Sequence, residues 1–408
     1  MNQNIYSISN CVNKNLFHSD VNGRKIFHYT LKNVVPLGAN MIYPNILLYS
    51  HEEDRIYNPS EERVMSLGKA KHGVKKDILH IQTQNVVSVP VFYFAYNTDN
   101  YFHFLYDSIP YLLSYKNLKK IDKDLKLLIG LPNKKATKPY QFVYECLELL
   151  GISKDDLEFV SQYTLYNTVY IASSYTYGID SNKPPPEEVK VLYEEMKTNA
   201  INTVDISLPK NIYISRRSWK HGDYSNIGTN YTTRRKMLNE DLLVEELEKF
   251  GYKEVFTETM SMKEKIRIFS GAEKIVGSIG GGLVNVLFSS PKTKLISVIS
   301  PGFLEVNGRF INSFQGVETL YSTNSRHSSN LKFKIHMRVE LSNGIIGEIT
   351  NIKEDVATVL YSEQNVAGWN SQENFLECKV LLQDLCCLDN GLNSEWFCDI
   401  DQVMELIK

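Results

Sequence analysis

Strand-like segments alternate with helical segments through the middle of the chain, and this alternation limits the possible fold more than any other feature. In the first series, strands are predicted at residues 86–96, 125–130 and 168–172, with helices at 101–118 and 139–150. In the second series, strands are predicted at 211–215, 252–256, 274–276 and 294–299, with helices at 239–250, 261–269 and 280–288. Strands that alternate with helices form parallel sheets covered on both faces, so the sequence predicts an α/β fold.

A proline run separates the two series. Pro184, Pro185 and Pro186 are followed by a predicted helix at 187–200 and then by a polar stretch. We therefore place a boundary at residue 204 and predict a Rossmann-like lobe on each side of it, the two facing a cleft.

The alternation of strands and helices stops after the second series. Successive strands are predicted there, with a β-hairpin turn at Asn343-Gly344 and a short helix at 401–407. The predicted domains are a first Rossmann-like lobe at 1–204, a second Rossmann-like lobe at 205–330 and a small all-β, barrel-like module at 331–408.

The composition is that of an ordinary globular protein. Of the 408 residues, 43% are hydrophobic and 23% are charged, and the formal net charge of −2 argues against a nucleic-acid partner. Six cysteines are thinly spread without a C-x-x-C pair, which favours reduced thiols. Neither a signal peptide nor an apolar run of roughly 20 residues is visible, so we expect a soluble, cytoplasmic protein whose oligomeric state stays open.

The first segment suited to chemistry is 100–110, with the sequence Asn-Tyr-Phe-His-Phe-Leu-Tyr-Asp-Ser-Ile-Pro. In a helix, His103 and Asp107 stand at i and i+4 and project from one face. At the carboxyl end of a strand, where open α/β sheets bind ligands, such a pair can supply a general base. The alternative is that His103 packs in the core and Asp107 holds it by a hydrogen bond.

A second segment, Ser215-Arg216-Arg217, follows a predicted strand directly. Arginine forks match the oxygens of a diphosphate, and the carboxyl end of a strand is where a nucleotide would lie. The alternative is an ordinary solvated basic loop.

A third segment, Gly280-Gly281-Gly282-Leu283, stands between a strand and a helix. This arrangement exposes backbone N–H groups to an anion at the start of the helix. The spacing matches neither a dinucleotide fingerprint nor a P-loop. The alternative is that the glycines only permit a tight turn.

Two D-x-D patterns, Asp122-Lys123-Asp124 and Asp399-Ile400-Asp401, match a common metal-binding pattern. Two acids one residue apart often arise by chance. The first pair lies in a lysine-rich turn, and the second is far from the glycines in sequence. We therefore expect neither a metal site nor a cofactor.

In this order and spacing, the segments resemble glycosyltransferase family 61, the DUF563 group, which includes plant xylosyl- and arabinosyltransferases, the EGF-domain O-GlcNAc transferase and bacterial capsule-type enzymes. The shared pattern is an Asn-aromatic-x-His-x-x-x-Asp helix, a strand ending in Ser-Arg, basic residues before Asn-Glu, and a Gly-x-His-Gly-Ala-Gly-Leu-x-Asn loop. The matching parts of this chain are 100–107, 215–217, 235–240 and 277–285. The resemblance covers about residues 86–300.

The resemblance implies a GT-B fold and an inverting transferase that moves a sugar from a nucleotide-sugar, expected to be a UDP-sugar, to a hydroxyl of a glycan or glycoconjugate acceptor. Asp107, with His103 beside it, would deprotonate the acceptor, and positive side chains with a helix end would replace a metal at the leaving diphosphate. The residues that the resemblance assigns to the donor site are Ser215, Arg216, Arg217, Arg235, Asn239, Glu240, Gly280, Gly281, Gly282, Leu283 and Asn285.

The glycine loop departs from the family pattern. Ile279 stands where the family has His, and Gly281 where it has Ala, so a donor contact is lost or is supplied by another residue such as His221. This departure leaves open a second function, a catalytically inactive protein that binds a glycan or nucleotide-sugar on the same fold. The lack of the membrane anchor found in eukaryotic relatives suggests a bacterial or viral enzyme.

Overall fold

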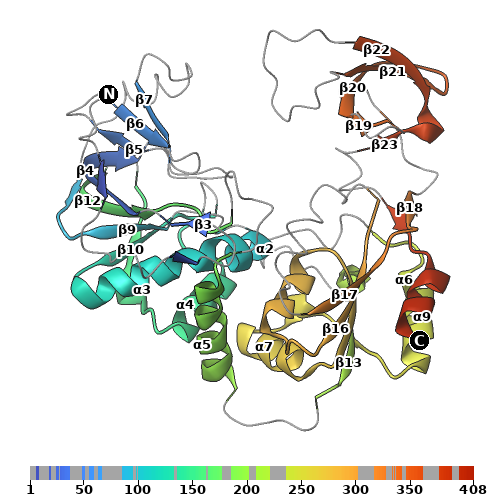
Figure 1. The fold of residues 1–408 in the computed structure, drawn as a ribbon, viewed down its shortest axis with the longest axis horizontal. Helices are drawn as coiled ribbons and strands as arrows, with labels where there is room; N and C mark the ends of the chain where they lie inside the picture. The colour runs from blue at the N-terminus through green and yellow to red at the C-terminus, as the bar shows by residue number, and fades with distance from the viewer. Residues whose placement is uncertain are drawn as a thin grey trace.

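The structure is a computed structural model that describes two α/β parts and a smaller β-sheet (Figure 1). The described residues are 6–8, 18–19, 24–26, 28–36, 48–50, 55–58, 63–66, 85–94, 98, 100–132, 136–161, 164–176, 185–201, 208–220, 236–301, 317–327, 333, 335, 337–341, 346–361, 376–387 and 395–408. The turn predicted at Asn343-Gly344 lies outside them.

The first sheet is mixed, with strand order β11-β10-β9-β12-β4-β5-β6-β7. The parallel strands are β9 (Val91–Phe94), β10 (Lys126–Ile129), β11 (Leu157–Phe159) and β12 (Thr164–Ala172). The antiparallel strands are β4 (His28–Pro36), β5 (Leu48–Ser50), β6 (Arg55–Asn58) and β7 (Arg63–Ser66). The prediction of a parallel sheet is therefore correct for the first group and wrong for the second, which comes from the weakly patterned beginning of the chain.

Short strands extend this part. β1 (Tyr6–Ile8) pairs with β4, β8 (Asn85–Val87) pairs with β12, and β2 (His18–Ser19) pairs with β3 (Arg24–Lys25). The single strand predicted at 86–96 is thus divided into β8 and β9. Pro90 stands between them, and a proline cannot donate a hydrogen bond within a sheet.

The helices of the first part agree with the sequence pattern. α2 (Tyr101–His103), a π-helical turn (Phe104–Ser108), a 3-10 turn (Ile109–Tyr111) and α3 (Leu112–Ile121) follow one another without a break. Asn100 caps this helix, since its side chain accepts from His103 N at 3.2 Å. α4 (Gln141–Leu149) is followed by Gly151 at φ 70°, the left-handed conformation that favours glycine after a helix. A 3-10 turn (Glu187–Val189) opens α5 (Lys190–Ala200).

The second sheet is fully parallel, as predicted, with strand order β14-β13-β15-β16-β17. Its strands are β13 (Asn211–Ile214), β14 (Lys253–Val255), β15 (Lys274–Ser278), β16 (Lys294–Val298) and β17 (Glu318–Ser322). Its helices are α6 (Glu240–Lys249), α7 (Met262–Gly271) and a 3-10 helix (Gly281–Phe288). The predicted capping box of α7 is present, because Ser261 and Glu264 bond each other's backbone N–H.

The alternating side chains of this sheet pack on two faces. Ile212 and Ile214 belong to an apolar core that continues into the first sheet through α5 and α7. Tyr213 points to the opposite face, into a core shared with α6 and α9 (Ile400–Ile407). Arg267 Nε also donates to Ala200 O at 3.0 Å, which joins α7 to the end of α5.

The C-terminal strands form a five-stranded antiparallel sheet, with order β22-β21-β20-β19-β23 and no pairing between its two ends among the described residues. The strands are β19 (Arg338–Glu340), β20 (Ile346–Lys353), β21 (Val356–Tyr361), β22 (Leu376–Leu381) and β23 (Cys386–Cys387). The predicted β module is therefore present as a sheet, and its description as a barrel stays a prediction.

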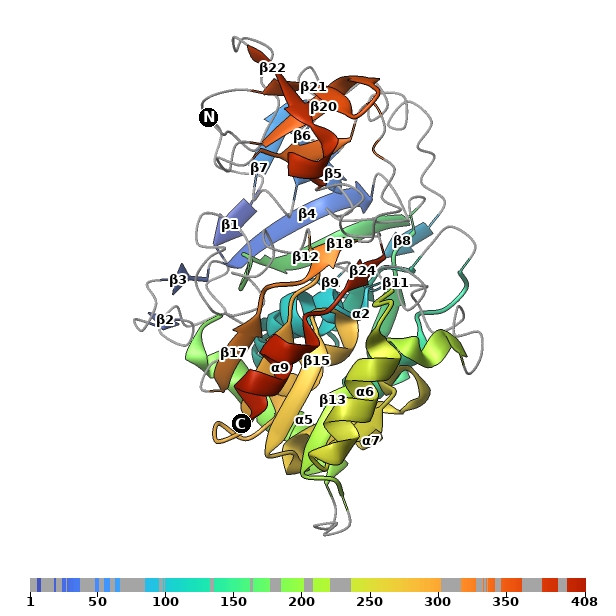
Figure 2. The ribbon, with the colours of Figure 1, turned by 90° about the vertical axis from the view of Figure 1, so that its right-hand side faces the viewer.

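The end of the chain returns to the second sheet. β18 (Arg326–His327) pairs with β24 (Trp396–Phe397), and α9 packs on β16 and β17 beside α6 (Figure 2). Asp399 caps α9 by accepting from Gln402 N at 3.0 Å. The last residues thus complete the core of the second sheet, although the sequence pattern grouped them with the β module.

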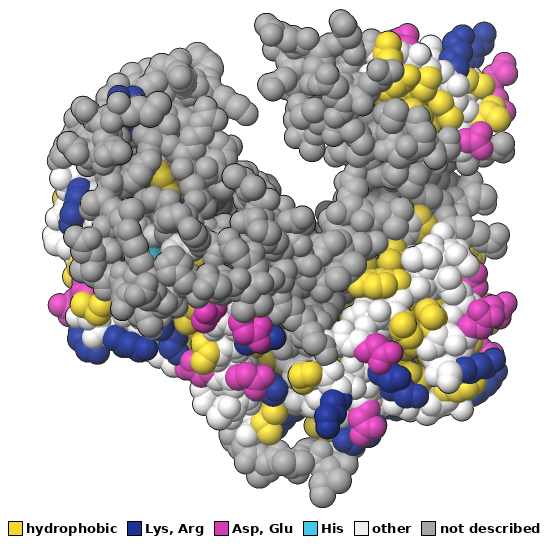
Figure 3. All heavy atoms as spheres, in the orientation of Figure 1, with side chains coloured by type: hydrophobic (Ala, Val, Ile, Leu, Met, Phe, Trp, Pro, Cys, Tyr) yellow, Lys and Arg dark blue, Asp and Glu magenta, His cyan; other side chains and the backbone are white. Residues whose placement is uncertain are grey.

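Charged side chains of both signs lie next to each other over the lower part of the face in Figure 3. This mixture agrees with the near-neutral net charge. Among the described residues, no helix has both the length and the apolar character needed to cross a bilayer.

Candidate active site

Tyr101 joins the two segments that the sequence marked for chemistry. Its hydroxyl donates to Asn285 Oδ1 at 2.6 Å and lies 3.1 Å from Met262 Sδ. A Cβ added to Gly281 would lie 3.9 Å from the Tyr101 ring. Tyr101 stands two residues before His103, so its contact with Asn285 brings the His103 helix next to the glycine loop. The helix follows the carboxyl end of β9, and the loop follows the carboxyl end of β15.

His103 and Asp107 form a hydrogen-bonded pair, as their spacing predicts. His103 Nδ1 lies 2.6 Å from Asp107 Oδ2. Asp107 stands in the π-helical turn, a distortion that often marks functional sites. The Asp107 side chain is only 1% exposed, whereas that of His103 is 33% exposed. The imidazole is therefore the member of the pair that a ligand can reach.

The second carboxylate oxygen of Asp107 is also bonded. Thr176 Oγ1 donates to Asp107 Oδ1 at 2.6 Å, and Thr176 is itself buried. A buried carboxylate needs such donors to remain ionised. Asp107 is thus held from two sides, by a helix neighbour and by the segment that follows β12.

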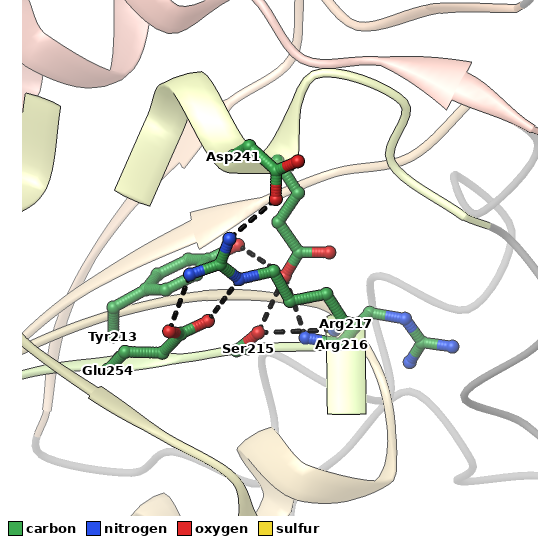
Figure 4. A network of polar contacts seen from close by, with 7 residues as sticks. Tyr213, Ser215, Arg216, Arg217, Asp241 and Glu254 are labelled. Atoms are coloured by element: carbon green, nitrogen blue, oxygen red, sulfur yellow. Dashed lines mark hydrogen bonds and ion pairs between the residues drawn. The ribbon is translucent and has the colours of Figure 1, made fainter. Parts of the chain in front are cut away.

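Glu240 organises the Ser-Arg segment at the end of β13. Figure 4 labels Tyr213, Ser215 and Arg216, which bond to it. Glu240 Oε1 accepts from Tyr213 Oη at 2.9 Å, from Ser215 Oγ at 3.0 Å and from the backbone N of Arg216 at 2.7 Å. Burial raises the pKa of the Glu240 carboxyl, and these hydrogen bonds with the nearby Arg216 charge act against that rise. Glu240 is 97% buried, and its hydrogen bonds fix the backbone of the Ser-Arg segment from the buried side.

The two arginines have different surroundings. Arg217 forms a two-pronged ion pair with Glu254, at 2.6 and 2.7 Å, and a second ion pair with Asp241. These partners raise the pKa of Arg217. Arg216 points away from this network (Figure 4), toward the glycine loop, and Gly280 leaves room for it because a Cβ there would lie 2.5 Å from Arg216 Nη1. Burial lowers the pKa of Arg216.

The glycine loop is closely packed on its neighbours. A Cβ on Gly282 would lie 2.6 Å from Thr257 Oγ1, so only glycine fits there without movement. Asn285, predicted to contact the donor, is fully buried and donates to Gly282 O at 2.7 Å, which braces the loop. Leu283 and Ile279 are buried in the apolar core.

Two charged residues at this junction were not found by the sequence interpretation. Lys265 of α7 is 7% exposed, its Nζ lies 4.4 Å from the centroid of the Tyr101 ring, and burial lowers its pKa. Glu258, in the turn after β14, interacts electrostatically with Arg216 and Lys265, and burial raises its pKa. The sequence offered one signal for each residue. Glu258 stands just after a predicted strand, and Lys265 stands near the start of a predicted helix.

The remaining predicted residues lie elsewhere or are not described. Asn239 exchanges two hydrogen bonds with the backbone of Cys398, at 2.8 and 2.9 Å, and so anchors the end of the chain. Arg235 and His221 lie outside the described residues. Asp122 accepts from Asp124 N in a turn. Within the described parts of the chain, no group of three or more His, Cys, Asp or Glu side chains is arranged to hold a metal ion.

The fold and the site define an α/β protein in which a buried arginine and a glycine loop lie at the carboxyl edge of a parallel sheet, opposite a His–Asp pair. Residues 101–296 match the family model described as Glycosyltransferase 61. The match confirms the resemblance and supports glycosyltransferase activity. No curated protein matches the chain.

Proposed function

We propose that the protein is an inverting glycosyltransferase that moves a sugar from a UDP-sugar to a hydroxyl of a glycan or glycoconjugate, with the two lobes arranged as in GT-B enzymes. The contact between Tyr101 and Asn285 carries this proposal, because it brings a general-base pair from one lobe to the anion-binding loop of the other. Without this contact, the two segments would be unrelated features of separate sheets.

In the proposed site, the donor diphosphate lies against Arg216 and the backbone N–H groups of residues 280–282. Backbone dipoles and a partly dehydrated guanidinium stabilise the negative charge that develops on the leaving diphosphate. These groups supply the charge stabilisation without a metal. Arg217 has a different task in this scheme, since its ion pairs with Glu254 and Asp241 hold the Ser-Arg segment in place.

The acid–base step uses the pair as a unit. His103 is the base, and Asp107 keeps its Nδ1 protonated, so that Nε2 accepts the proton of the acceptor hydroxyl. The acceptor oxygen then bonds to the anomeric carbon as the carbon–oxygen bond to the diphosphate breaks, and the diphosphate leaves with the electron pair. This assignment revises the expectation that Asp107 itself removes the proton, because its carboxylate is buried and bonded on both oxygens.

A thermal-shift screen of nucleotide-sugars is the first experiment, since a ligand that binds only the folded state raises the melting temperature. With the donor identified, turnover is measured by UDP release with a glycan acceptor. We expect His103→Gln and Asp107→Asn each to lower kcat by about 100- to 10,000-fold while the UDP affinity stays unchanged.

The donor site is tested separately by calorimetry. We expect Arg216→Ala to weaken UDP binding by more than about tenfold, because a charge-assisted contact contributes about 1.5–3 kcal/mol. Lys249→Ala, which removes an exposed cation of α6, is the control and should bind UDP normally. Normal turnover by His103→Gln refutes the base, and normal binding by Arg216→Ala refutes the donor site. UDP-sugar binding without any turnover by the unaltered protein favours the inactive binding protein instead.

A further inference from the structure

The segment after β12 makes two separate connections to the helix that carries His103. Thr176 Oγ1 donates to Asp107 Oδ1, and Tyr175 Oη shares a hydrogen bond of 2.6 Å with Ser114 Oγ. Asp107 and Ser114 are seven residues apart, in the π-helical turn and in α3 of the same continuous helical run. The side chains of residues 175 and 176 therefore hold this run at two places.

A third residue extends this polar chain into the first sheet. His28 Nε2 of β4 lies 2.7 Å from Ser114 Oγ, and His28, Ser114 and Tyr175 are all buried. Core side chains that bond each other in this way have little freedom to move. These bonds join Tyr175 to the helix and, through Ser114, to β4. The hydroxyl of the adjacent residue, Thr176, is therefore held in one position.

We propose that Thr176 is a positioning residue for the transfer reaction, the third member of a Thr176–Asp107–His103 chain, an inference that rests on the proposed function. Its hydroxyl occupies Asp107 Oδ1 and leaves Oδ2 directed at His103 Nδ1. The carboxylate then has one rotational position, and the imidazole keeps the tautomer whose Nε2 is free of a proton. Thr176 is 1% exposed, so its role would be to orient Asp107 and not to contact a substrate.

Thr176→Val tests this role, because it replaces the hydroxyl by a methyl group of similar volume, whereas Thr176→Ser keeps the hydroxyl. We expect Thr176→Val to lower kcat by roughly 10- to 100-fold, with the KM for the donor within about twofold of its normal value. Thr176→Ser should restore kcat to within about threefold. The donor KM is unaffected because the donor contacts lie on the other lobe.

Thr293→Val is the matched control. Thr293 is equally buried, and its hydroxyl donates to Ala272 O at 2.9 Å, at the opposite edge of the second sheet from the glycine loop. The control loses a buried hydroxyl hydrogen bond without touching the proposed chain, so its kcat should remain normal. An equal loss of kcat in Thr293→Val would overturn the positioning role and point to general destabilisation.

An imidazole proton resonance gives a reading that does not depend on turnover. The Nδ1 proton of His103, assigned by its loss in His103→Gln, should be observed in the unaltered protein and in Thr176→Ser, and should broaden or shift in Thr176→Val.

Normal kcat in Thr176→Val, or equal impairment of the Ser and Val variants, overturns the proposal. If the Val variant does not fold, Thr176→Ala replaces it in the same comparison. Normal kcat in His103→Gln would instead refute the proposed base, and absence of turnover by the unaltered protein would refute the proposed function.

Discussion

Replacement of Glu240 tests whether the Ser-Arg segment is held from beneath by a single carboxylate. Glu240 accepts three hydrogen bonds on one oxygen, and its negative charge acts against the lowering of the Arg216 pKa by burial. Two variants separate these two contributions. Glu240→Ala removes the oxygen and the charge, and Glu240→Gln removes only the charge.

The burial of Glu240 and of its three hydrogen-bond donors sets the size of the effect. Glu240→Ala leaves Tyr213 Oη, Ser215 Oγ and the Arg216 backbone N–H without their acceptor, so it should lower the free energy of unfolding by about 3–5 kcal/mol. Glu240→Gln keeps an acceptor for Tyr213, Ser215 and the Arg216 backbone, and should cost about 1–2 kcal/mol. Both variants should bind UDP more weakly, since the backbone of the Ser-Arg segment that carries Arg216 is held less firmly.

Urea denaturation measures the free energies, and calorimetry measures UDP affinity. Glu245→Ala, an exposed carboxylate on the same helix, is the control and should change the free energy of unfolding by less than about 0.5 kcal/mol. Equal effects of the Ala and Gln variants would show that the charge, and not the three hydrogen bonds, accounts for the loss. Effects of both below about 0.5 kcal/mol would refute the organising role of Glu240 altogether.

Two further predictions follow from burial. Burial lowers the pKa of His28 from 6.5 to about 4, so unfolding takes up a proton between these pH values. The free energy of unfolding should therefore fall by about 3 kcal/mol as the pH drops through that range. Urea denaturation of His28→Gln should show a smaller fall, and an equal fall would contradict the assignment. Gly280→Ala should displace the Arg216 guanidinium and weaken UDP binding by about tenfold in calorimetry, and unchanged affinity would show that Arg216 is not held against the loop.

The sequence predicted the helices and strands well wherever a residue pattern is local. The capping box at Ser261, the glycine ends of α4 and α6, and the parallel strands of the second sheet all follow from neighbouring residues. The strands between residues 28 and 66 were missed because short antiparallel strands depend on their partners more than on their own periodicity.

The candidate site was predicted in its parts but not in its arrangement. His103 and Asp107 could be paired from their spacing, because four residues bring two side chains to one face of a helix. The different surroundings of Arg216 and Arg217 could not be predicted, since Glu254 and Asp241 are distant in sequence. Lys265 and Glu258 were missed because they differ from other charged residues in being buried, and burial depends on residues distant in sequence.

By itself, the sequence determined the α/β class, the order of the elements, the family and the residue types at the site, because these depend on local patterns and motif spacing. Only the tertiary structure decided which residues share a site and which member of each pair is accessible. The Tyr101–Asn285 contact spans 184 residues, and the buried carboxylate of Asp107 accepts a hydrogen bond from Thr176, 69 residues away. Burial and hydrogen-bond partners are properties of the packed chain, and they separate an accessible base from the carboxylate that orients it.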